Sequence, residues 1–510
     1  ARLPAQSPPF APARAAFPSS PRKGLLRSSP TGGGAAWPAA GRRPPPPPRG
    51  GPRAAGGPHM AADVGAGLRR AEAICKGVTA GAAAGSSSEA EEAQRTGAEP
   101  AETSSAAEEP LAPLGCPLPG AWAVAGDLLW DGVADAALPG LCVVVRGDRI
   151  HSLRPVAEVR RAGVPLERRE GCCLLPGLID AHIHMEFSED YALHEQPSLT
   201  RDQLLDSMAE RALRMLRSGI TTARDLGGRD FAALRLRDEI LAGRLQGPRL
   251  VCAGQPLTTP KGHCHQWGGG AASLQEAKAV VQRQAKHGVD WIKVMATGGM
   301  RTPGTDVRRA QFSADFLREV VAEAEALGLP VAAHAHGSAG VAVAVAAGCR
   351  TVEHCTWIGE GGLWGTTDDE VVQEMARRGV RVAPTAHARW KRRPMGDHNY
   401  QRMSGALRQL RRAGVPVVAS SDAGAIPSLR HEALPGGIAV LADMAGLSPV
   451  EALRAATSSC AEAICLGEEC GRLAPGFAAD LLLVAGDPTR DLAVLRRPCL
   501  VVARGRCVEP

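Results

Sequence analysis

Two histidines separated by one residue end an apolar run and are the first candidates for chemistry. The run begins at Leu174 and places His182 and His184 at its end. Because side chains on a strand alternate between its two faces, these imidazoles project from the same side. Neutral imidazole binds zinc and neighbouring first-row metals, and two such ligands on one strand leave coordination positions open for catalysis. An isolated pair of this kind is equally compatible with ordinary surface or core histidines.

The chain around this pair alternates between strand-like and helix-like stretches. Eight stretches have the composition of buried strands: 174–184, 220–226, 249–253, 291–296, 331–336, 351–355, 380–385 and 415–421. Helical stretches separate most of them, among them 204–216, 274–287, 314–327 and 369–378, with Ser273 and Ser313 as expected N-caps. Eight such units over about 250 residues predict an α/β fold of the TIM (β/α)8 barrel type. A doubly wound open sheet is the alternative, but no G-x-G-x-x-G follows the first strand.

Residues that bind metals recur at the expected strand ends, where a TIM barrel carries its chemistry. They are His182, His184, Lys293, His334, His336, His354 and Asp422. Each histidine alone is compatible with a structural core residue, but their coincidence at the ends of several strands indicates a metal centre. Lys293 lies within an apolar strand, where lysine is almost never buried unpaired. Either it reaches solvent at the strand's edge, or its amine is neutralised or converted into an anion.

Five motifs extend this pattern: PGLIDAHIH at 176–184, IKVMATGG at 292–299, AHAHG at 333–337, VEHCT at 352–356 and SDAG at 421–424. In this order they resemble the amidohydrolase superfamily, and specifically its branch of two-metal hydrolases with a carbamylated lysine. That branch includes Xaa-Arg/Lys and prolidase-like carboxypeptidases and ochratoxin-type amidases. The resemblance covers roughly residues 121–508, and GRLAPGFAAD at 471–480 looks like the family's return to its small β domain.

The resemblance implies a ligand set and two catalytic residues. His182 and His184 would bind one divalent metal ion, and His334 and His354 a second. Lys293, carboxylated by CO2, would bridge the two ions, and Asp422 would bind the first ion and move protons. We expect zinc, although manganese, iron or cobalt suit the same ligands. Two such ions would acidify a bridging water to hydroxide and polarise the scissile carbonyl.

Four further side chains are candidates for contacts with the substrate. His336 would point into the pocket, and His263 lies in a loop at 262–265 that resembles a substrate-facing loop of the family. Arg301 and His387 could hold a substrate carboxylate. A plain loop histidine and a solvated loop arginine are the alternative interpretations of His263 and Arg301. The charged stretch 389–393 is expected to be a solvated loop and is given no function.

The expected activity is hydrolysis of a carbon–nitrogen bond, in an amide or a dipeptide. A lactonase or phosphotriesterase-like hydrolase could use the same site, because the same hydroxide attacks esters and phosphorus centres. A single-metal hydrolase of the imidazolonepropionase or deaminase type is less favoured, because those relatives do without the bridging lysine. A catalytically inactive scaffold is the alternative outside the enzymes. The expected partner is a small-molecule substrate, with a homo-oligomer possible.

The chain divides into three expected regions. Residues 1–120 have a low-complexity composition typical of disorder, and Met60 is the expected start of the protein. Residues 121–175 and 465–510 predict one small β-sandwich domain built from both flanks of a barrel at 176–464.

Charge and cysteine content limit the expected partners and the expected cellular location. The formal charge of +6 over 510 residues arises from residues 1–59, which hold nine basic side chains and no acidic one, so the remainder is mildly acidic. Neither a nucleic-acid partner nor a transmembrane helix is expected. Fourteen cysteines without a CxxC pair indicate reduced thiols and a cytoplasmic location, or a mitochondrial one if residues 1–59 are translated.

Overall fold

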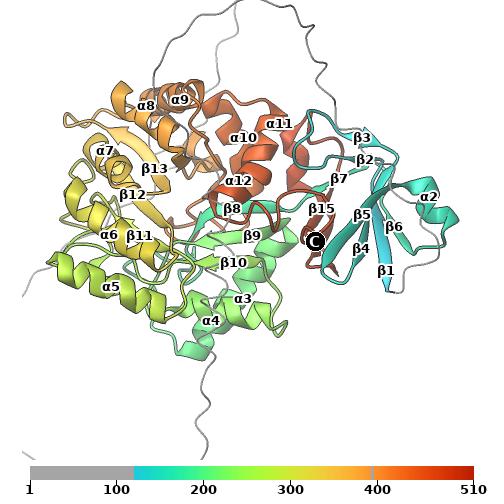
Figure 1. The fold of residues 1–510 in the computed structure, drawn as a ribbon, viewed down its shortest axis with the longest axis horizontal. Coiled ribbons are helices and arrows are strands. Elements are labelled where there is room, and N and C mark those ends of the chain that lie inside the picture. Colours follow the sequence, from blue (N-terminus) through green and yellow to red (C-terminus); the bar gives the residue numbers. More distant parts are fainter. Residues whose placement is uncertain (1–119, 392–395) are drawn as a thin grey trace, which may run out of the picture. The chain divides into compact units, whose positions relative to one another are not determined.

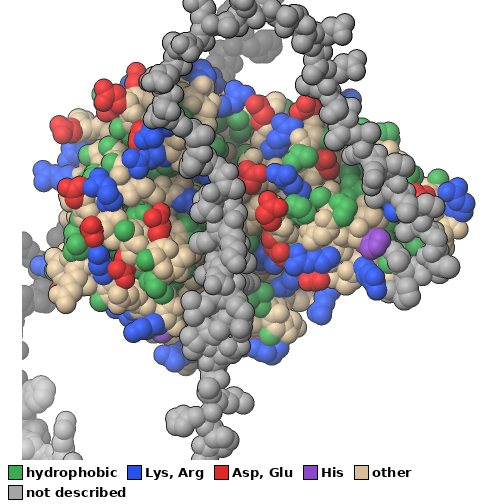
Figure 2. Space-filling view, in the orientation of Figure 1, with side chains coloured by type: hydrophobic (Ala, Val, Ile, Leu, Met, Phe, Trp, Pro, Cys, Tyr) green, Lys and Arg blue, Asp and Glu red, His purple; other side chains and the backbone are tan. Residues whose placement is uncertain are grey.

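The computed structural model describes residues 120–391 and 396–510, and Figure 1 shows their arrangement. The expectations of disorder over 1–120 and of a start at Met60 concern residues that, Gly120 apart, lie outside these ranges. No described helix is long and apolar enough to cross a bilayer. On the face that Figure 2 presents, acidic and basic side chains are intermingled.

The central part of the chain is α/β, with two parallel sheets. The first has the order β10-β9-β8 and the second the order β11-β12-β13-β14. Their strands are β8 (Leu178–Ile183), β9 (Ile220–Asp225), β10 (Arg249–Cys252), β11 (Ile292–Met295), β12 (Val331–Gly337), β13 (Thr351–Ile358) and β14 (Arg381–Ala383). Nearly every residue of these strands is buried, as expected for parallel strands covered on both faces.

Helices follow most of the strands and lie outside them in Figure 1. They are α3 (Arg201–Arg217), α4 (Ala232–Leu241), α5 (Leu274–Lys286), α6 (Ala314–Ala326), α7 (Ser338–Ala347), α8 (Asp369–Arg378), α9 (Gly396–Arg412), α10 (Leu434–Ala445), α11 (Pro449–Ala455) and α12 (Ser458–Ala463). The predicted N-caps are confirmed, because the Ser273 hydroxyl accepts from the Glu276 amide and the Ser313 hydroxyl from the Phe316 amide.

Single bridges, rather than continuous pairing, link the two parallel sheets. A parallel bridge joins Leu257 to Val294, one joins Val382 to Val417, and one joins Ile183 to Ala423. The predicted eighth strand at 415–421 is therefore wrong as a regular strand: this segment makes one isolated bridge, from Val417 to β14, and the bridge to β8 comes from Ala423 beyond it. The Val418 amide donates to the Val382 carbonyl at 2.9 Å and the Ala181 amide to the Ala419 carbonyl at 3.1 Å. The segment thus lies between β14 and β8, where it brings Asp422 beside the histidine pair.

The two flanks of the chain share a sheet. Its order is β17-β16-β15-β7-β2-β3, and β15 (Leu481–Ala485) pairs antiparallel with β7 (Cys172–Pro176). The other members are β2 (Leu128–Leu129), β3 (Leu138–Pro139), β16 (Pro498–Ala503) and β17 (Arg506–Val508). A second sheet has the order β5-β4-β1-β6 and contains β1 (Ala121–Ala125), β4 (Leu141–Arg146), β5 (Arg149–Pro155) and β6 (Leu166–Arg168), with α2 (Val156–Arg161) after β5.

The expected single strand over 174–184 is in fact two strands that meet at Gly177. β7 belongs to the shared flank sheet, and β8 belongs to the parallel sheet. Gly177 itself donates its amide to the Asp480 carbonyl, and the next amide, of Leu178, donates to the Gly219 carbonyl, both at 2.9 Å. A Cβ at Gly177 would stand 2.0 Å from the Thr221 hydroxyl oxygen. Only glycine lets the chain pass from one sheet to the other at this point.

We expect Gly177→Ala to lower the free energy of unfolding by about 1–3 kcal/mol, because the added methyl overlaps buried Thr221 and forces a backbone shift. Denaturant titration would measure this. The matched control is Gly405→Ala in α9, where the added Cβ meets no atom within 4 Å. That variant should be unchanged or more stable by up to about 1 kcal/mol. Equal unfolding midpoints for the two variants would contradict the argument.

Candidate active site

His182, His184 and Asp422 form a compact triangle of ligand atoms. The Nε2 atoms of the two histidines are 3.3 Å apart. Each of them lies 3.4 Å from Asp422 Oδ1. Ligands held tetrahedrally at the zinc distance are separated from one another by about 3.3 Å. The three atoms are therefore spaced as one small ion requires.

The second nitrogen of each histidine in this triangle is fixed by a hydrogen bond. His184 Nδ1 lies 2.7 Å from the Gly227 carbonyl oxygen, and His182 Nδ1 lies 2.9 Å from Glu353 Oε2. Both partners can only accept, so each Nδ1 carries a proton and each Nε2 is turned toward Asp422. Metal-binding histidines are commonly oriented in this way.

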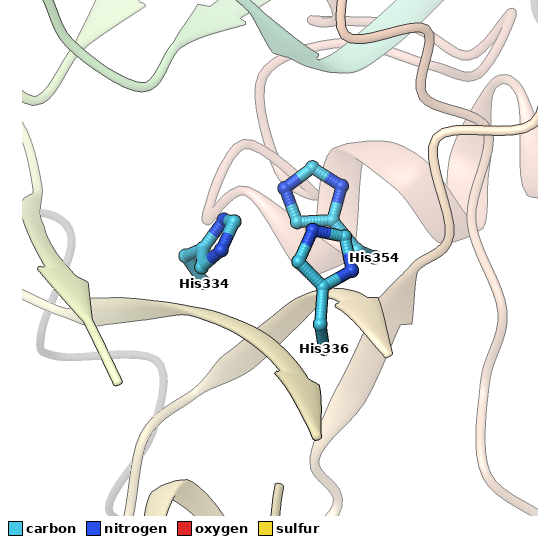
Figure 3. A group of neighbouring side chains, drawn as sticks. All are labelled: His334, His336 and His354. Atoms are coloured by element: carbon cyan, nitrogen blue, oxygen red, sulfur yellow. The ribbon is translucent and has the colours of Figure 1, made fainter. Parts of the chain in front are cut away.

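His334 and His336 of β12 and His354 of β13 form a second group (Figure 3), with ligand atoms within 4.8 Å of one another. Thr356 holds His336 Nδ1 at 3.0 Å, and Thr385 holds His354 Nδ1 at 3.1 Å. His334 Nε2 lies 3.2 Å from the Gly298 carbonyl oxygen. The structure thus places His336 beside both predicted ligands of the second ion, and the choice of His334 over His336 stays a prediction.

Burial and mutual repulsion keep most of these imidazoles neutral. Burial and the charge of nearby Lys293 lower the pKa of His182 to about 4, and burial is the main cause that lowers the pKa of His336 to about 4. Burial together with neighbouring histidines brings the pKa of His334 and His354 well below the usual value. At neutral pH these rings therefore present lone pairs, which is the form that binds a cation.

The pair of Asp422 and His184 behaves differently. Burial alone would raise the pKa of Asp422, but the hydrogen bond with His184 and the charges of His182, His184 and Lys293 lower it to about 2. Burial alone would lower the pKa of His184, but Asp422 raises it above the ordinary value. A carboxylate that stays ionised inside the protein needs a compensating positive charge, supplied either by a proton on His184 or by a bound cation.

Lys293 is buried among these groups without a hydrogen-bond partner. Its side chain is 1% exposed, and its Nζ atom makes no hydrogen bond within the described residues. Burial lowers its pKa to about 8, although the charge of Glu353 opposes this. The interpretation that Lys293 reaches solvent at the strand's edge is therefore wrong. An amine with this pKa is uncharged in an appreciable fraction of molecules near neutral pH, and an uncharged amine can react with CO2.

Left-handed backbone conformations occur at two of the candidate ligands. His354 has φ 64° and Asp422 has φ 63°. Non-glycine residues rarely adopt this region, and where they do so the surrounding structure holds them there. The Asp422 amide donates to the His182 carbonyl at 2.8 Å, which ties this conformation to the histidine strand. Two residues further on, Gly424 has φ 93° and approaches His184 so closely that a Cβ would stand 2.1 Å from its carbonyl oxygen.

A cavity of about 570 Å3 opens over both groups of ligands. All the predicted site residues line it: His182, His184, His263, Lys293, Arg301, His334, His336, His354, His387 and Asp422. His263 is fixed by Thr302, whose hydroxyl lies 2.8 Å from its Nδ1, and burial lowers its pKa to about 3. The loop after β11 reaches His263 at Gly299, where a Cβ would stand 2.3 Å from the imidazole ring.

Known proteins with related sequences place the chain in a family. The model of the amidohydrolase family matches residues 173–508. The chain belongs to the amidohydrolase family.

Three known proteins are similar to this amidohydrolase in sequence or in structure. Ochratoxinase of Aspergillus niger is 27% identical over 375 residues, which cover 64% of this chain and 72% of ochratoxinase. An imidazolonepropionase of Chloroflexus aggregans is 27% identical over 395 residues, covering 69% and 86% of the two chains. The crystal structure of a Xaa-Pro dipeptidase with bound methionine in its active site has a TM-score of 0.65 at 25% identity, and covers 76% of this amidohydrolase and all of the dipeptidase.

Sequence reasoning missed a buried ion pair behind the first ligand. Arg224 Nη2 lies 2.8 Å from Glu353 Oε1, and the other oxygen of Glu353 accepts from His182. Arg224 also donates to the Ala181 carbonyl at 2.8 Å and stacks over Trp291 at 4.4 Å. Both charged side chains are fully buried. The only sequence signal was two charged residues inside apolar strands, and it does not say that they pair.

The cavity also includes side chains to which the sequence gave no role. Trp364, Arg389 and Trp390 line it, although 389–393 was expected to be only a solvated loop. Arg389 is exposed, in agreement with that expectation, but it lies in a short 3-10 helix rather than a loop and donates to the Pro427 carbonyl. Residues 392 and 393 lie outside the described ranges. The sequence alone does not show that Trp364, Arg389 and Trp390 line the same cavity as the predicted metal ligands.

Proposed function

We propose that the chain is a binuclear metal-dependent hydrolase that cleaves the carbon–nitrogen bond of an amide or a dipeptide. The observation that carries the proposal is the placement of two ligand groups, each with ligand atoms within 4.8 Å, in one cavity with a buried lysine that has no hydrogen-bond partner among the described residues. Membership of the amidohydrolase family and the similarity to ochratoxinase and a Xaa-Pro dipeptidase support it.

The donor set fits two divalent ions. His182, His184 and Asp422 would hold one ion, and His334 and His354 the other, with carboxylated Lys293 between them. Nitrogen and carboxylate ligands of this kind suit zinc, manganese, iron or cobalt, of which we propose zinc. Bound there, the ions would lower the pKa of water and polarise the substrate carbonyl.

The chain's own residues would supply the remaining chemistry. Asp422 lies within 3.4 Å of both first-group imidazoles and is ionised, so it can take a proton from water and give it to the leaving amine. His263, His336, Arg301 and His387 line the same cavity and would contact the substrate. Thr302 and Thr356 fix the rings of His263 and His336, so these two side chains are oriented before a substrate binds.

Carboxylation would convert Lys293 from an unpaired amine into an anionic ligand. Its Nζ atom attacks the carbon of CO2, one N–H proton leaves to solvent, and the carbamate carries one negative charge. The low pKa of Lys293 supplies the uncharged amine for this reaction. The product would give the two histidine groups a carboxylate-type ligand.

Other hydrolytic chemistry at this site is distinguished by metal content and substrate. A lactonase or phosphotriesterase-like activity would need the same two ions but would act on esters. A single-metal hydrolase of the imidazolonepropionase type would leave the second histidine group and Lys293 without a function. The retained ligand atoms of both groups argue against a catalytically inactive scaffold.

We expect metal removal to abolish hydrolysis. Protein loaded with zinc should contain two ions per chain by plasma mass spectrometry. It should hydrolyse a panel of N-acyl amino acids and dipeptides, and a chelator should reduce the rate by about a thousandfold or more, because several kcal/mol of transition-state stabilisation are lost. Zinc should restore the rate. One ion per chain would instead indicate the single-metal reaction, and no ion in well-folded, inactive protein would indicate a scaffold.

A further inference from the structure

The wall of the cavity beside the first ligand group is apolar and reaches the candidate metal site. Trp267 stacks on Phe187 with ring centroids 4.8 Å apart, and its edge lies against His184 at 5.6 Å. Met295 and Leu193 pack with the same two aromatic rings. Of these residues, Leu193, Trp267 and Met295 line the cavity, so a substrate that places its carbonyl at the ligand groups meets apolar side chains there.

The outer part of the cavity repeats this aromatic character. Trp364 and Trp390 line it and are half-buried, and Trp390, in the short helix η2 (Ala388–Lys391), stands edge-on to His387 at 5.9 Å. Met300 also lines the cavity, and is 50% exposed. Exposed large apolar side chains around a cavity mark a surface that a ligand covers.

The charges on the outer wall have one sign. Arg301 and Arg389 both line the cavity, and both lie close enough to His387 to contribute to the low pKa of its imidazole. Asp422 is the only carboxylate among the described residues of the lining, and it belongs to the first ligand group. Arg389 directs one N–H to the Pro427 carbonyl, so its other donors remain for a ligand.

We propose that this cavity selects amides that carry both a large planar apolar group and a carboxylate, and that it rejects substrates with a cationic side chain. The inference rests on the proposed hydrolytic function of the same site. Tryptophan and methionine surfaces bind the planar group, and the guanidinium groups of Arg301 and Arg389 bind the carboxylate. A cationic side chain finds no anionic partner in the outer wall and is repelled there. N-acylated aromatic amino acids have this chemistry, and a cavity of about 570 Å3 accommodates them.

Binding of non-hydrolysable analogues tests the selection without turnover. In the ketomethylene analogue of N-benzoyl-L-phenylalanine, a CH2 group replaces the amide NH. Isothermal titration of the zinc-loaded full chain would compare this acid with its primary carboxamide and with the corresponding arginine analogue. We expect the acid to bind about tenfold or more tightly than either, because a charge-assisted hydrogen bond contributes that much.

Variants assign the selection to the outer wall. The double variant Arg301→Gln/Arg389→Gln should lose the preference for the acid over the carboxamide. Arg309→Gln, at a position 86% exposed on the same loop as Arg301, is the matched control and should keep it. Trp364→Ala should weaken the acid and the carboxamide alike. Equal binding of acid and carboxamide, a preference that survives the double variant, tighter binding of the arginine analogue, or no binding at all would each overturn the proposal.

Hydrolysis is measured separately, so that failure of either proposal can be recognised. If the analogues bind with the expected selectivity but N-benzoyl-L-phenylalanine is not cleaved, the selection stands and the hydrolytic function fails. If amides are cleaved but those with cationic side chains are preferred, the hydrolytic function stands and the selection fails.

Discussion

The variant Lys293→Met should lose hydrolysis by about a thousandfold or more and should bind fewer metal ions than the unaltered protein. Methionine has a similar length but no nitrogen, so the carbamate that would bridge the two ligand groups cannot form. Because Lys293 is buried and its Nζ atom has no hydrogen-bond partner among the described residues, replacing it with an apolar side chain should leave the fold intact. Plasma mass spectrometry and an amide-hydrolysis assay measure the two effects, and circular dichroism checks the fold.

The control for this variant is Lys286→Met, at the exposed last residue of α5. Its metal content and activity should match those of the unaltered protein. Carbon-13 NMR with labelled bicarbonate should show a carbamate signal in the unaltered protein and in Lys286→Met, but not in Lys293→Met. Full metal content and activity in Lys293→Met would exclude a bridging role for this lysine.

The variant Glu353→Gln should destabilise the protein by about 3–5 kcal/mol, because it leaves Arg224 as an uncompensated buried charge. Burial alone would raise the pKa of Glu353, but Arg224, His182 and Lys293 lower it to about 2, so the native group is ionised at neutral pH. The amide can still accept from His182 but no longer increases the basicity of the ring. Metal affinity should therefore fall by about ten- to a hundredfold. Denaturant titration and a competitive zinc assay measure the two effects.

Two further variants separate stability from metal binding. Glu370→Gln, at an exposed position in the first turn of α8, should change neither quantity. The pair Arg224→Met/Glu353→Gln removes the buried charge of Arg224 and should recover much of the lost stability while zinc affinity stays low. If zinc affinity recovers together with stability, Glu353 acts on the fold alone and does not position His182.

Features that depend only on residues close together in the sequence were predictable from it. The serine caps of α5 and α6 form hydrogen bonds within three residues, and the alternation of a strand places His182 and His184 on one side whatever surrounds them. Seven of the eight strand positions correspond to strands of the parallel sheets, because runs of buried apolar residues suit that environment. The eighth, at 415–421, contains the same residue types but makes only one isolated bridge, between Val417 and Val382.

The sequence also shows which residues could bind metal or carry charge, but it does not show which of them lie next to one another in the folded protein. Arg224 and Glu353 form an ion pair although 129 residues separate them in the sequence. His336 lies close to His354 because β12 and β13 are paired side by side. Gly177 separates two strands that belong to different sheets, although the apolar run around it reads as one strand. The contact that requires glycine there is with Thr221, which is distant in the sequence. Trp364 and Arg389 enter the cavity from segments outside every motif. Caps and alternation are local and follow from the sequence alone, whereas the ion pair, the second histidine group and the cavity wall depend on distances that only the packed chain sets.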